Sequence, residues 1–184
     1  MRIVILASGG GSLAQAIFDA DLSLEILQVI SDKPSQVLTR AELAGIPTTY
    51  LPMEGDRDIW DAQLFTLISG LNPDLVVSVG FMRILSAKFV SNFPTINTHP
   101  ALLPNFPGAH AVRDAITAGV QTTGATVHWV DEGVDTGKVI VAEQVQVLAG
   151  DDASSLHERI KIVERQLIVE TLAKFVATGI DGKN

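Results

Sequence analysis

Cysteine is absent from this chain of 184 residues. Its absence excludes disulfide bonds, zinc sites built on cysteine and catalysis by a thiol nucleophile. The sequence also lacks a serine in the strained Gly-x-Ser-x-Gly turn that exposes a hydroxyl nucleophile, so we expect no covalent intermediate with the protein. The four histidines and the nearby carboxylates do not have the spacing of metal ligands, and we therefore expect no metal.

Basic residues and long apolar runs are scarce too. The chain has 13 Lys and Arg against 21 Asp and Glu, a formal charge of −8, which argues against nucleic acid or an anionic membrane as a partner and leaves a local basic pocket open. No stretch approaches the roughly 20 apolar residues of a membrane span. The run Ile3–Ala7 is shorter than the roughly 7 to 15 residues of a signal-peptide core. We expect a soluble, cytoplasmic protein.

Short apolar runs alternate with segments of helical periodicity along the whole chain. Strands are expected at residues 3–7, 24–30, 48–51, 75–79, 95–98, 123–130 and 138–147. Helices are expected at 12–19, from Pro34 to near Gly45, from Asp56 to Gly70, at 109–118, and from Asp151 or Asp152 to Gly179. This alternation predicts an α/β fold with a mostly parallel, twisted sheet, helices on both faces and a long C-terminal helix.

The most informative stretch is residues 96–104, with the sequence INTHPALLP. Because side chains alternate along a strand, Asn97 and His99 point to the same face. Pro100 cannot continue a sheet ladder, so His99 lies at the carboxyl end of the strand, the edge where parallel sheets bind ligands. Taken singly, each would be a buried polar residue satisfied by its neighbours. Together, an amide donor beside an imidazole predicts a site that holds an oxyanion and moves a proton.

Two further motifs follow expected strands. The sequence FMRIL occupies residues 81–85, directly after Gly80. The sequence GATVHWV occupies residues 124–130 and is followed by Asp135, Thr136 and Gly137. Alone, the first would be core and the second would end in an ordinary tight turn.

These three motifs, in this order and spacing, resemble those of the folate-dependent formyltransferases over nearly the whole chain. The resemblance implies a Rossmann-like formyltransferase fold in one domain, residues 1–184, with a phosphate-binding half (1–95) and a catalytic and folate-loop half (96–184). It also implies direct transfer of the formyl group of 10-formyltetrahydrofolate, without a metal. Within the family the chain is most similar to the branch that formylates the amine of glycinamide ribonucleotide in purine biosynthesis.

The resemblance implies that Asn97, His99 and Asp135 are catalytic. The Asn97 amide and a protonated His99 would donate hydrogen bonds to the developing oxyanion. His99 would also move protons between the amine and the folate nitrogen. The Asp135 carboxylate would stabilise the charged ring and so raise the pKa of His99.

Binding residues are implied in the same way. Backbone N–H groups of Gly11, Ser12 and Leu13, at a helix start, would hold the phosphate of the ribonucleotide; the family often has Asn where this chain has Leu13. Lys161 would meet the phosphate and Glu164 the amine side, although by spacing alone they would form an ordinary surface ion pair. The folate-binding residues would be Arg57, Met82, Arg83, Ile84, Leu85, Asn97, Asp131 and Val134.

Other function classes stay open at this point. Gly9-x-Gly11-x-x-Ala14, with Asp32 after the second strand, fits a loose dinucleotide fingerprint and a nicotinamide-dependent oxidoreductase. That alternative gives Asn97, His99 and Asp135 no common role. Asp32 would otherwise be a strand-end turn residue. A non-catalytic binding module is a further alternative.

Two relatives that share the catalytic motifs carry additional domains. Formyltetrahydrofolate hydrolase has an N-terminal regulatory domain, and methionyl-tRNA formyltransferase has a C-terminal domain that helps bind tRNA. Since Met1 nearly begins the first strand and the chain stops near its last helix, we expect neither. A monomer and a homodimer are both compatible with the sequence.

Overall fold

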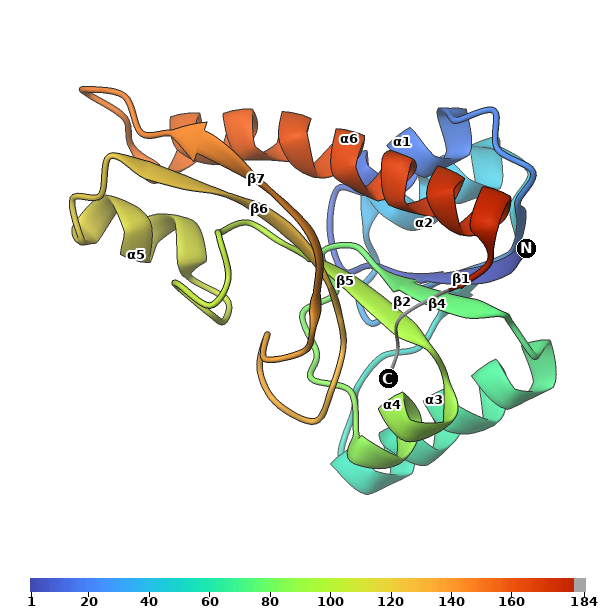
Figure 1. The fold of residues 1–184 in the computed structure, drawn as a ribbon. Helices are drawn as coiled ribbons and strands as arrows, with labels where there is room; N and C mark the ends of the chain where they lie inside the picture. Colours follow the sequence, from blue (N-terminus) through green and yellow to red (C-terminus); the bar gives the residue numbers. More distant parts are fainter. Residues whose placement is uncertain (181–184) are drawn as a thin grey trace. The chain divides into compact units, whose positions relative to one another are not determined.

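The computed structural model describes residues 1–180 (Figure 1). Its strands are β1 (Arg2–Leu6), β2 (Glu25–Ser31), β3 (Thr48–Tyr50), β4 (Leu75–Ser78), β5 (Thr95–His99), β6 (Thr122–Trp129) and β7 (Val139–Gln146). Its helices are α1 (Ser12–Asp19), α2 (Gln36–Leu43), α3 (Arg57–Leu71), α4 (Ala87–Asn92), α5 (Ala111–Thr117) and α6 (Ala153–Thr178). The strand order is β3-β2-β1-β4-β5-β6-β7. The chain divides into two compact units, Met1–Ile96 and the part from Asn97 onward.

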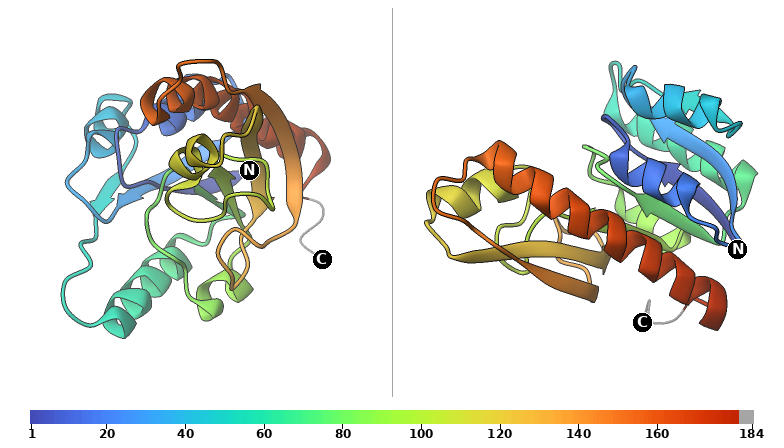
Figure 2. Two further views of the ribbon diagram at one scale, coloured as in Figure 1. Left: turned by 90° about the vertical axis from the view of Figure 1, so that its left-hand side faces the viewer. Right: turned by 90° about the horizontal axis from the view of Figure 1, so that it is seen from above.

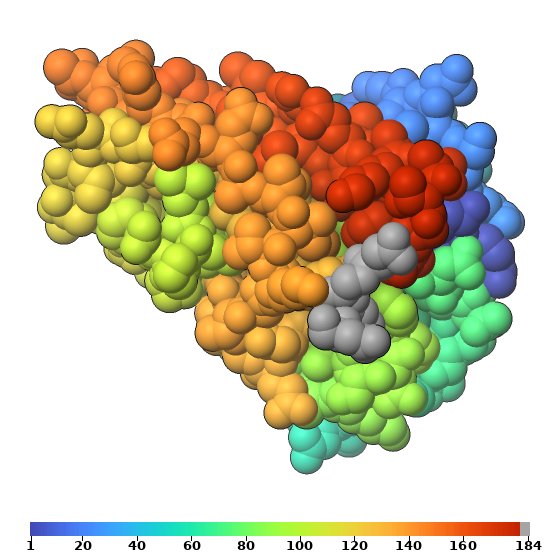
Figure 3. Space-filling view, viewed as in Figure 1, coloured from blue at the N-terminus to red at the C-terminus, as the bar shows by residue number. Residues whose placement is uncertain are grey.

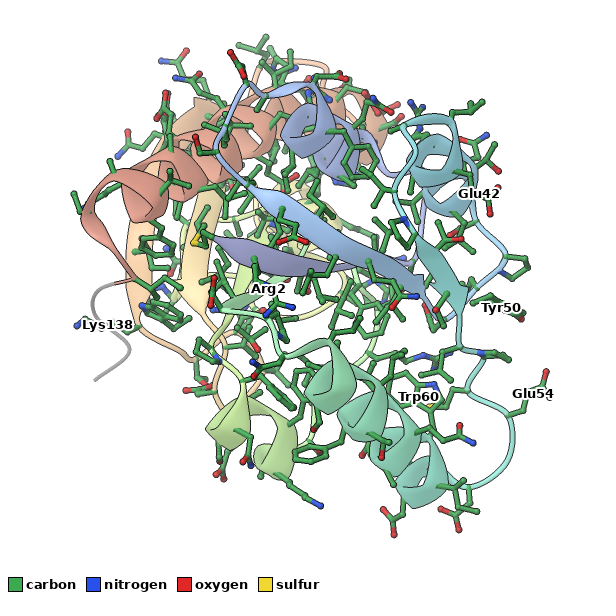
Figure 4. All side chains as sticks on the ribbon, turned by 90° about the vertical axis from the view of Figure 1, so that its right-hand side faces the viewer. Arg2, Glu42, Tyr50, Glu54, Trp60 and Lys138 are labelled. Atoms are coloured by element: carbon green, nitrogen blue, oxygen red, sulfur yellow. The ribbon has the colours of Figure 1, made fainter. Side chains whose placement is uncertain are left out.

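The first unit is built on parallel strands. Strand β1 pairs with β2 and with β4, so that Ile3 lies opposite Ile26 on one side and Leu75 on the other. Helices α1 and α2 lie on one face of these strands and α3 on the opposite face (Figure 4). With both faces covered, the side chains from Ile3 to Leu6 are fully buried, which explains why this strand is an unbroken apolar run.

Aromatic rings hold the helices α3 and α4 of the first unit. The rings of Phe65 and Phe93 lie 5.1 Å apart, and Trp60 stacks on Phe81 at 6.3 Å. Trp60 is buried, and its Nε1–H donates to the carbonyl oxygen of Leu51 at 3.1 Å, which satisfies the polar end of the ring. These contacts anchor the segment that follows β4.

The second unit contains the antiparallel hairpin of β6 and β7. Helix α6 runs along this hairpin (Figure 2, right), and the Trp129 and Phe175 rings stack at 5.7 Å. On the face in Figure 3, β7 and α6 form adjoining surfaces. At Gly124 a Cβ atom would lie 2.1 Å from the Glu143 carbonyl oxygen, so only glycine lets the two strands approach so closely there.

Helix α6 has well-defined ends. Asp152 accepts from the Ser155 N–H at 2.8 Å while the Ser155 hydroxyl accepts from the Asp152 N–H at 3.1 Å, a reciprocal capping box. Gly179, with φ of 86°, follows the last turn. Within residues 1–180, no helix combines the length and apolar character needed to cross a bilayer.

The α/β class and the mostly parallel sheet with a long C-terminal helix are confirmed. Three local expectations were wrong. Gly70 lies inside α3, which ends one residue later at Leu71 and has Asn72 as its C-cap in the left-handed conformation (φ 48°). Pro34 lies before α2, whose N-cap is Ser35. Helix α4 was not expected, because its six residues are too few to establish a periodicity.

Candidate active site

Strand β5 presents its side chains to two environments. Asn97 and His99 share one face by strand alternation, and Thr98 points to the other. His99 and Thr98 are buried, whereas Asn97 is half-buried. The strand therefore delivers one partly accessible amide and one enclosed imidazole to the same side.

The His99 ring is held at both nitrogens. Nδ1 lies 3.2 Å from Oδ2 of Asp135, and Nε2 lies 2.8 Å from the carbonyl oxygen of Phe106. Both neighbours are hydrogen-bond acceptors, so a ring with protons on both nitrogens can satisfy both contacts. The structure thus brings His99 and Asp135 together, although they lie far apart along the chain.

Asp135 is fixed by its backbone as well as by its carboxylate. Its φ is 54°, in the left-handed region that Asp and Asn adopt more readily than most residues. Oδ2 accepts the Gly108 N–H at 2.8 Å. Burial raises the pKa of Asp135, but the contacts with His128, the Gly108 N–H and His99 outweigh it, so that the pKa is lowered. Asp135 is therefore a carboxylate at neutral pH.

The pKa of His99 moves in the direction opposite to the one expected from its partner. Burial lowers it, and this effect exceeds the raising effects of the Asp135 charge and of the Phe106 carbonyl; the nearby His128 lowers it further. Asp135 does favour the charged ring, as expected, but the net pKa lies below the ordinary value. The sequence did not reveal how completely the ring is enclosed.

His128 is a fourth polar residue in this group, although it was not among the residues predicted to be catalytic. Its Nδ1 lies 2.8 Å from the carbonyl oxygen of Trp129, so this nitrogen carries the proton. Nε2 lies 3.2 Å from the Asn97 amide nitrogen and 3.4 Å from Oδ1 of Asp135. Its place in the GATVHWV motif, shortly before Asp135, was the available signal.

Glu164 does not form the surface ion pair with Lys161 that its spacing alone would indicate. Glu164 lies on α6 and is only 4% exposed. Burial raises its pKa to about 7, against the opposing effects of Thr98, Lys161 and Arg165. The Thr98 hydroxyl has no hydrogen-bond partner of good geometry among the described residues, so its contact with the carboxyl is weak. Lys161 pairs with Glu158 at 2.7 Å. A surface ion pair between Lys161 and Glu164 was thus the wrong alternative.

In the first unit, the turn before α1 depends on one glycine. Gly11 has φ of 73° and forms the N-cap of α1 without any side-chain hydrogen bond. A Cβ atom there would lie 2.7 Å from Val37 Cβ. Ser12 opens the helix and Leu13 follows it, both half-buried. No side chain therefore caps the start of the helix, and its backbone N–H groups can donate hydrogen bonds to an anion.

The loop after β4 has both buried and exposed apolar side chains. Phe81 and Leu85 are buried, while Met82 and Ile84 are each 56% exposed. Arg57, at the start of α3, contacts Asp61 at 2.9 Å and donates to the Ile84 carbonyl. The loop therefore offers apolar side chains on its surface while its backbone is tied to the rest of the unit.

Asp131 and Val134 lie in the loop between β6 and β7. Oδ1 of Asp131 accepts the Gly133 N–H at 3.0 Å and the Thr136 hydroxyl at 2.7 Å, which closes a tight turn. Val134 is 46% exposed beside Asp135. No cluster of three or more His, Cys, Asp or Glu within residues 1–180 could hold a metal ion.

Asp32 is a structural acid of the first unit and not a free strand-end residue. Its side chain is fully buried and pairs with Arg83 at 2.6 Å, and it accepts the Ser8 hydroxyl at 2.5 Å. The acid of a dinucleotide site accepts ribose hydroxyls, but both oxygens here are engaged by the protein itself. The nicotinamide alternative loses its main support.

Known proteins resemble this chain closely. A model of the formyl transferase family matches residues 1–172. A phosphoribosylglycinamide formyltransferase of Mycobacterium tuberculosis is 46% identical over 186 residues, which cover 97% of this chain and 86% of that protein. The human trifunctional purine biosynthetic protein adenosine-3 is 40% identical over 187 residues, which cover 97% of this chain and 18% of that protein.

Solved structures agree with these relatives. Glycinamide ribonucleotide transformylase 1 from Symbiobacterium toebii has a TM-score of 0.93 and 35% identity, covering 100% of this chain and 92% of that one. Phosphoribosylglycinamide formyltransferase from Bacillus halodurans has a TM-score of 0.92 and 34% identity, covering 98% and 97%. On the family match and the sequence identities, this chain belongs to the formyl transferase family.

Proposed function

We propose that this formyltransferase moves the formyl group of 10-formyltetrahydrofolate to the amine of glycinamide ribonucleotide in purine biosynthesis. The names of its relatives support formyl transfer to glycinamide ribonucleotide, and the resemblance of the site motifs supports 10-formyltetrahydrofolate as the donor. The observation that carries the proposal is that Asp135 contacts His99, while His128 links the same carboxylate to the Asn97 amide. An amide donor, an imidazole and a carboxylate are the groups that direct acyl transfer to an amine requires.

In the proposed reaction the amine nitrogen attacks the formyl carbon, and the carbonyl electron pair moves to oxygen. Asn97 and protonated His99 donate hydrogen bonds to that oxyanion, and for this Nε2 of His99 exchanges its contact with the Phe106 carbonyl oxygen for the substrate oxygen; removal of one such donor typically costs about 10²–10³ in rate. When the intermediate collapses, the carbon–nitrogen bond to the folate breaks, N10 gains a proton and the attacking nitrogen loses one. His99 carries this proton between the two nitrogens.

Asp135 supports the charged state of His99 in this scheme. Its lowered pKa keeps it anionic at neutral pH. Burial lowers the pKa of His99 and so disfavours the charged ring. The carboxylate offsets part of the effect of burial and so favours the charged ring, the form that donates a proton.

The binding roles follow the resemblance residue by residue. The backbone of Gly11, Ser12 and Leu13 would bind the ribonucleotide phosphate, which the uncapped start of α1 favours. Lys161 would meet the phosphate and Glu164 the amine side of the same substrate. The folate would contact Arg57, Met82, Arg83, Ile84, Leu85, Asn97, Asp131 and Val134. The exposed side chains of Met82 and Ile84 support an apolar surface for a pterin.

The proposal includes a location and an organisation. We propose that the enzyme acts in the cytoplasm, as a monomer or homodimer, with residues 1–184 as one formyltransferase domain. In that domain, residues 1–95 would form the phosphate-binding half and residues 96–184 the catalytic and folate-loop half.

The deciding experiment follows 10-formyltetrahydrofolate consumption by the purified protein with and without glycinamide ribonucleotide. Consumption that requires the ribonucleotide, with formylated product by mass spectrometry, would support the transferase. Equal consumption without the ribonucleotide would indicate a formyltetrahydrofolate hydrolase. No consumption under either condition would overturn the proposal, and binding of a nicotinamide dinucleotide would then be measured.

A further inference from the structure

A fully buried carboxylate joins three segments of the first unit and takes no part in the reaction proposed above. The Asp32 side chain, just after β2, is 0% exposed. Its Oδ2 lies 2.6 Å from Nε of Arg83, and its Oδ1 accepts the Ser8 hydroxyl at 2.5 Å. A buried ionised group is tolerated only when charge and hydrogen bonds compensate it, and both are present here.

Ser8 extends this contact to the backbone. Its hydroxyl donates to Asp32 and accepts the Met82 N–H at 2.9 Å. Its own N–H donates to the Gly80 carbonyl oxygen at 3.0 Å. The segment Gly80–Leu85, the 80–85 loop, is therefore attached to Asp32 twice: through the Arg83 side chain and, by way of Ser8, through the Met82 N–H.

We propose that Asp32 is a positioning residue for folate binding, because it fixes the backbone of the 80–85 loop. This inference rests on the proposed function, in which that loop receives the pterin. Asp32 acts through Arg83 and Ser8 and not by touching a substrate. Since the Met82 N–H is used within the protein, recognition of a ligand is left to the other backbone groups of the loop, and their direction depends on this anchor.

The glycine turn before α1 is held by separate bonds. The Gly9 carbonyl oxygen accepts the Val37 N–H at 3.2 Å, and the Gly10 carbonyl oxygen accepts from Arg40 Nε at 2.8 Å. Loss of the Asp32 charge therefore disturbs the 80–85 loop more than the proposed phosphate-binding turn. The expected signature is a rise in the KM for the folate with little change in the KM for the ribonucleotide.

Two variants separate the two attachments. Asp32→Asn keeps the shape but removes the charge and turns an amide donor or a neutral oxygen toward Arg83. Ser8→Ala keeps the Asp32–Arg83 ion pair and removes the bridge to Met82. Asp151→Asn is the matched control: its carboxylate is 6% exposed and pairs with Arg159 at the start of α6, outside the proposed machinery.

The test measures kcat and both KM values and, without any substrate, amide hydrogen exchange at Met82. In Asp32→Asn and Ser8→Ala we expect the folate KM to rise about tenfold, the ribonucleotide KM to change by less than about twofold, and Met82 exchange to accelerate. Asp151→Asn should show neither the KM change nor the faster exchange. If Asp32→Asn does not fold, Ser8→Ala carries the same test.

Wild-type folate KM and wild-type Met82 exchange in Ser8→Ala would overturn the inference, as would equal rises of both KM values in all three variants. The proposed function fails independently, if the wild-type protein forms no formylated ribonucleotide. In that case faster Met82 exchange in the two variants would still support the anchoring of the loop, and unchanged exchange would refute it.

Discussion

Nδ1 of His99 lies 3.2 Å from Oδ2 of Asp135, in a site where the histidine is only 3% exposed. The pair combines two opposing influences on one ring: burial lowers the pKa of His99, and the carboxylate raises it. The carbonyl oxygen of Phe106 holds the other ring nitrogen at 2.8 Å, so the ring has a fixed orientation. This pair makes the protonation state of His99 the property that mutagenesis can address most directly.

Replacement of His99 by alanine removes both the donor and the proton carrier. We expect kcat for formyl transfer to fall by about 10²–10⁴ while the protein stays folded. Steady-state kinetics and circular dichroism measure the two effects. His110→Ala is the control, because His110 is exposed at the start of α5 and makes no capping hydrogen bond with its side chain. A folded His99→Ala protein with wild-type turnover would contradict the proposed mechanism.

Replacement of Asp135 by asparagine removes a charge that raises the pKa of His99. The pKa of His99 should therefore fall further, and the limb of the kcat–pH profile that reports His99 should move to lower pH. Asparagine tolerates the left-handed backbone at this position and can still accept the Gly108 N–H. An unchanged profile with full activity would leave Asp135 as a loop residue only.

Glu164 makes stability depend on pH in a known direction. Its folded pKa, raised to about 7, exceeds its ordinary value of 4.5, so the native state binds the proton more tightly than the unfolded state. The contribution of Glu164 to the free energy of unfolding is therefore present in full below pH 4.5. It is lost as pH rises through 7, a change of about 3 kcal/mol.

Glu164→Gln should therefore be more stable than the wild type at about pH 8, by up to about 3 kcal/mol, and nearly equal to it at about pH 4. Urea unfolding at both pH values measures the difference. Glu158→Gln is the control, since Glu158 lies on the same helix with its side chain 67% exposed. A Glu164→Gln difference that does not change with pH would contradict the burial of a titrating carboxyl.

Gly11→Ala tests the turn before α1. At φ of 73° an alanine is strained by about 1–2 kcal/mol, and its Cβ would lie 2.7 Å from Val37. We expect a loss of about 2 kcal/mol or more in the free energy of unfolding, together with a higher KM for the ribonucleotide. At Gly10 the nearest atom to a Cβ is 3.8 Å away, so Gly10→Ala should be nearly neutral. Equal stabilities of the two variants would argue against a strained turn.

Local patterns predicted the parts of the molecule that depend on neighbours in sequence. The spacing of Asn97 and His99 is enough to put them on one face, and Ser12–Asp19 was predicted with its observed bounds. The end of helix α3 was harder to predict, because nothing in the sequence distinguishes a glycine inside a helix from one that ends it. The left-handed Asn72, and not Gly70, marks the end of the helix.

Contacts between distant segments were not predictable in the same way. His128 meets Asn97 and Asp135 only after the hairpin has formed. Glu164 did carry a signal: it follows Ile160 by four residues and precedes Leu167 by three, which puts it on the buried stripe of α6. The sequence interpretation followed its polarity, and the position on the helix face proved decisive.

The engagement of Asp32 by Arg83 and Ser8 has a consequence for automated motif searches. A pattern that combines glycines after a first strand with an acid after the second will select this chain as a dinucleotide enzyme. The acid is already neutralised by an arginine from the loop after β4. In this chain the ion pair marks the glycine pattern as a false match to the dinucleotide fingerprint.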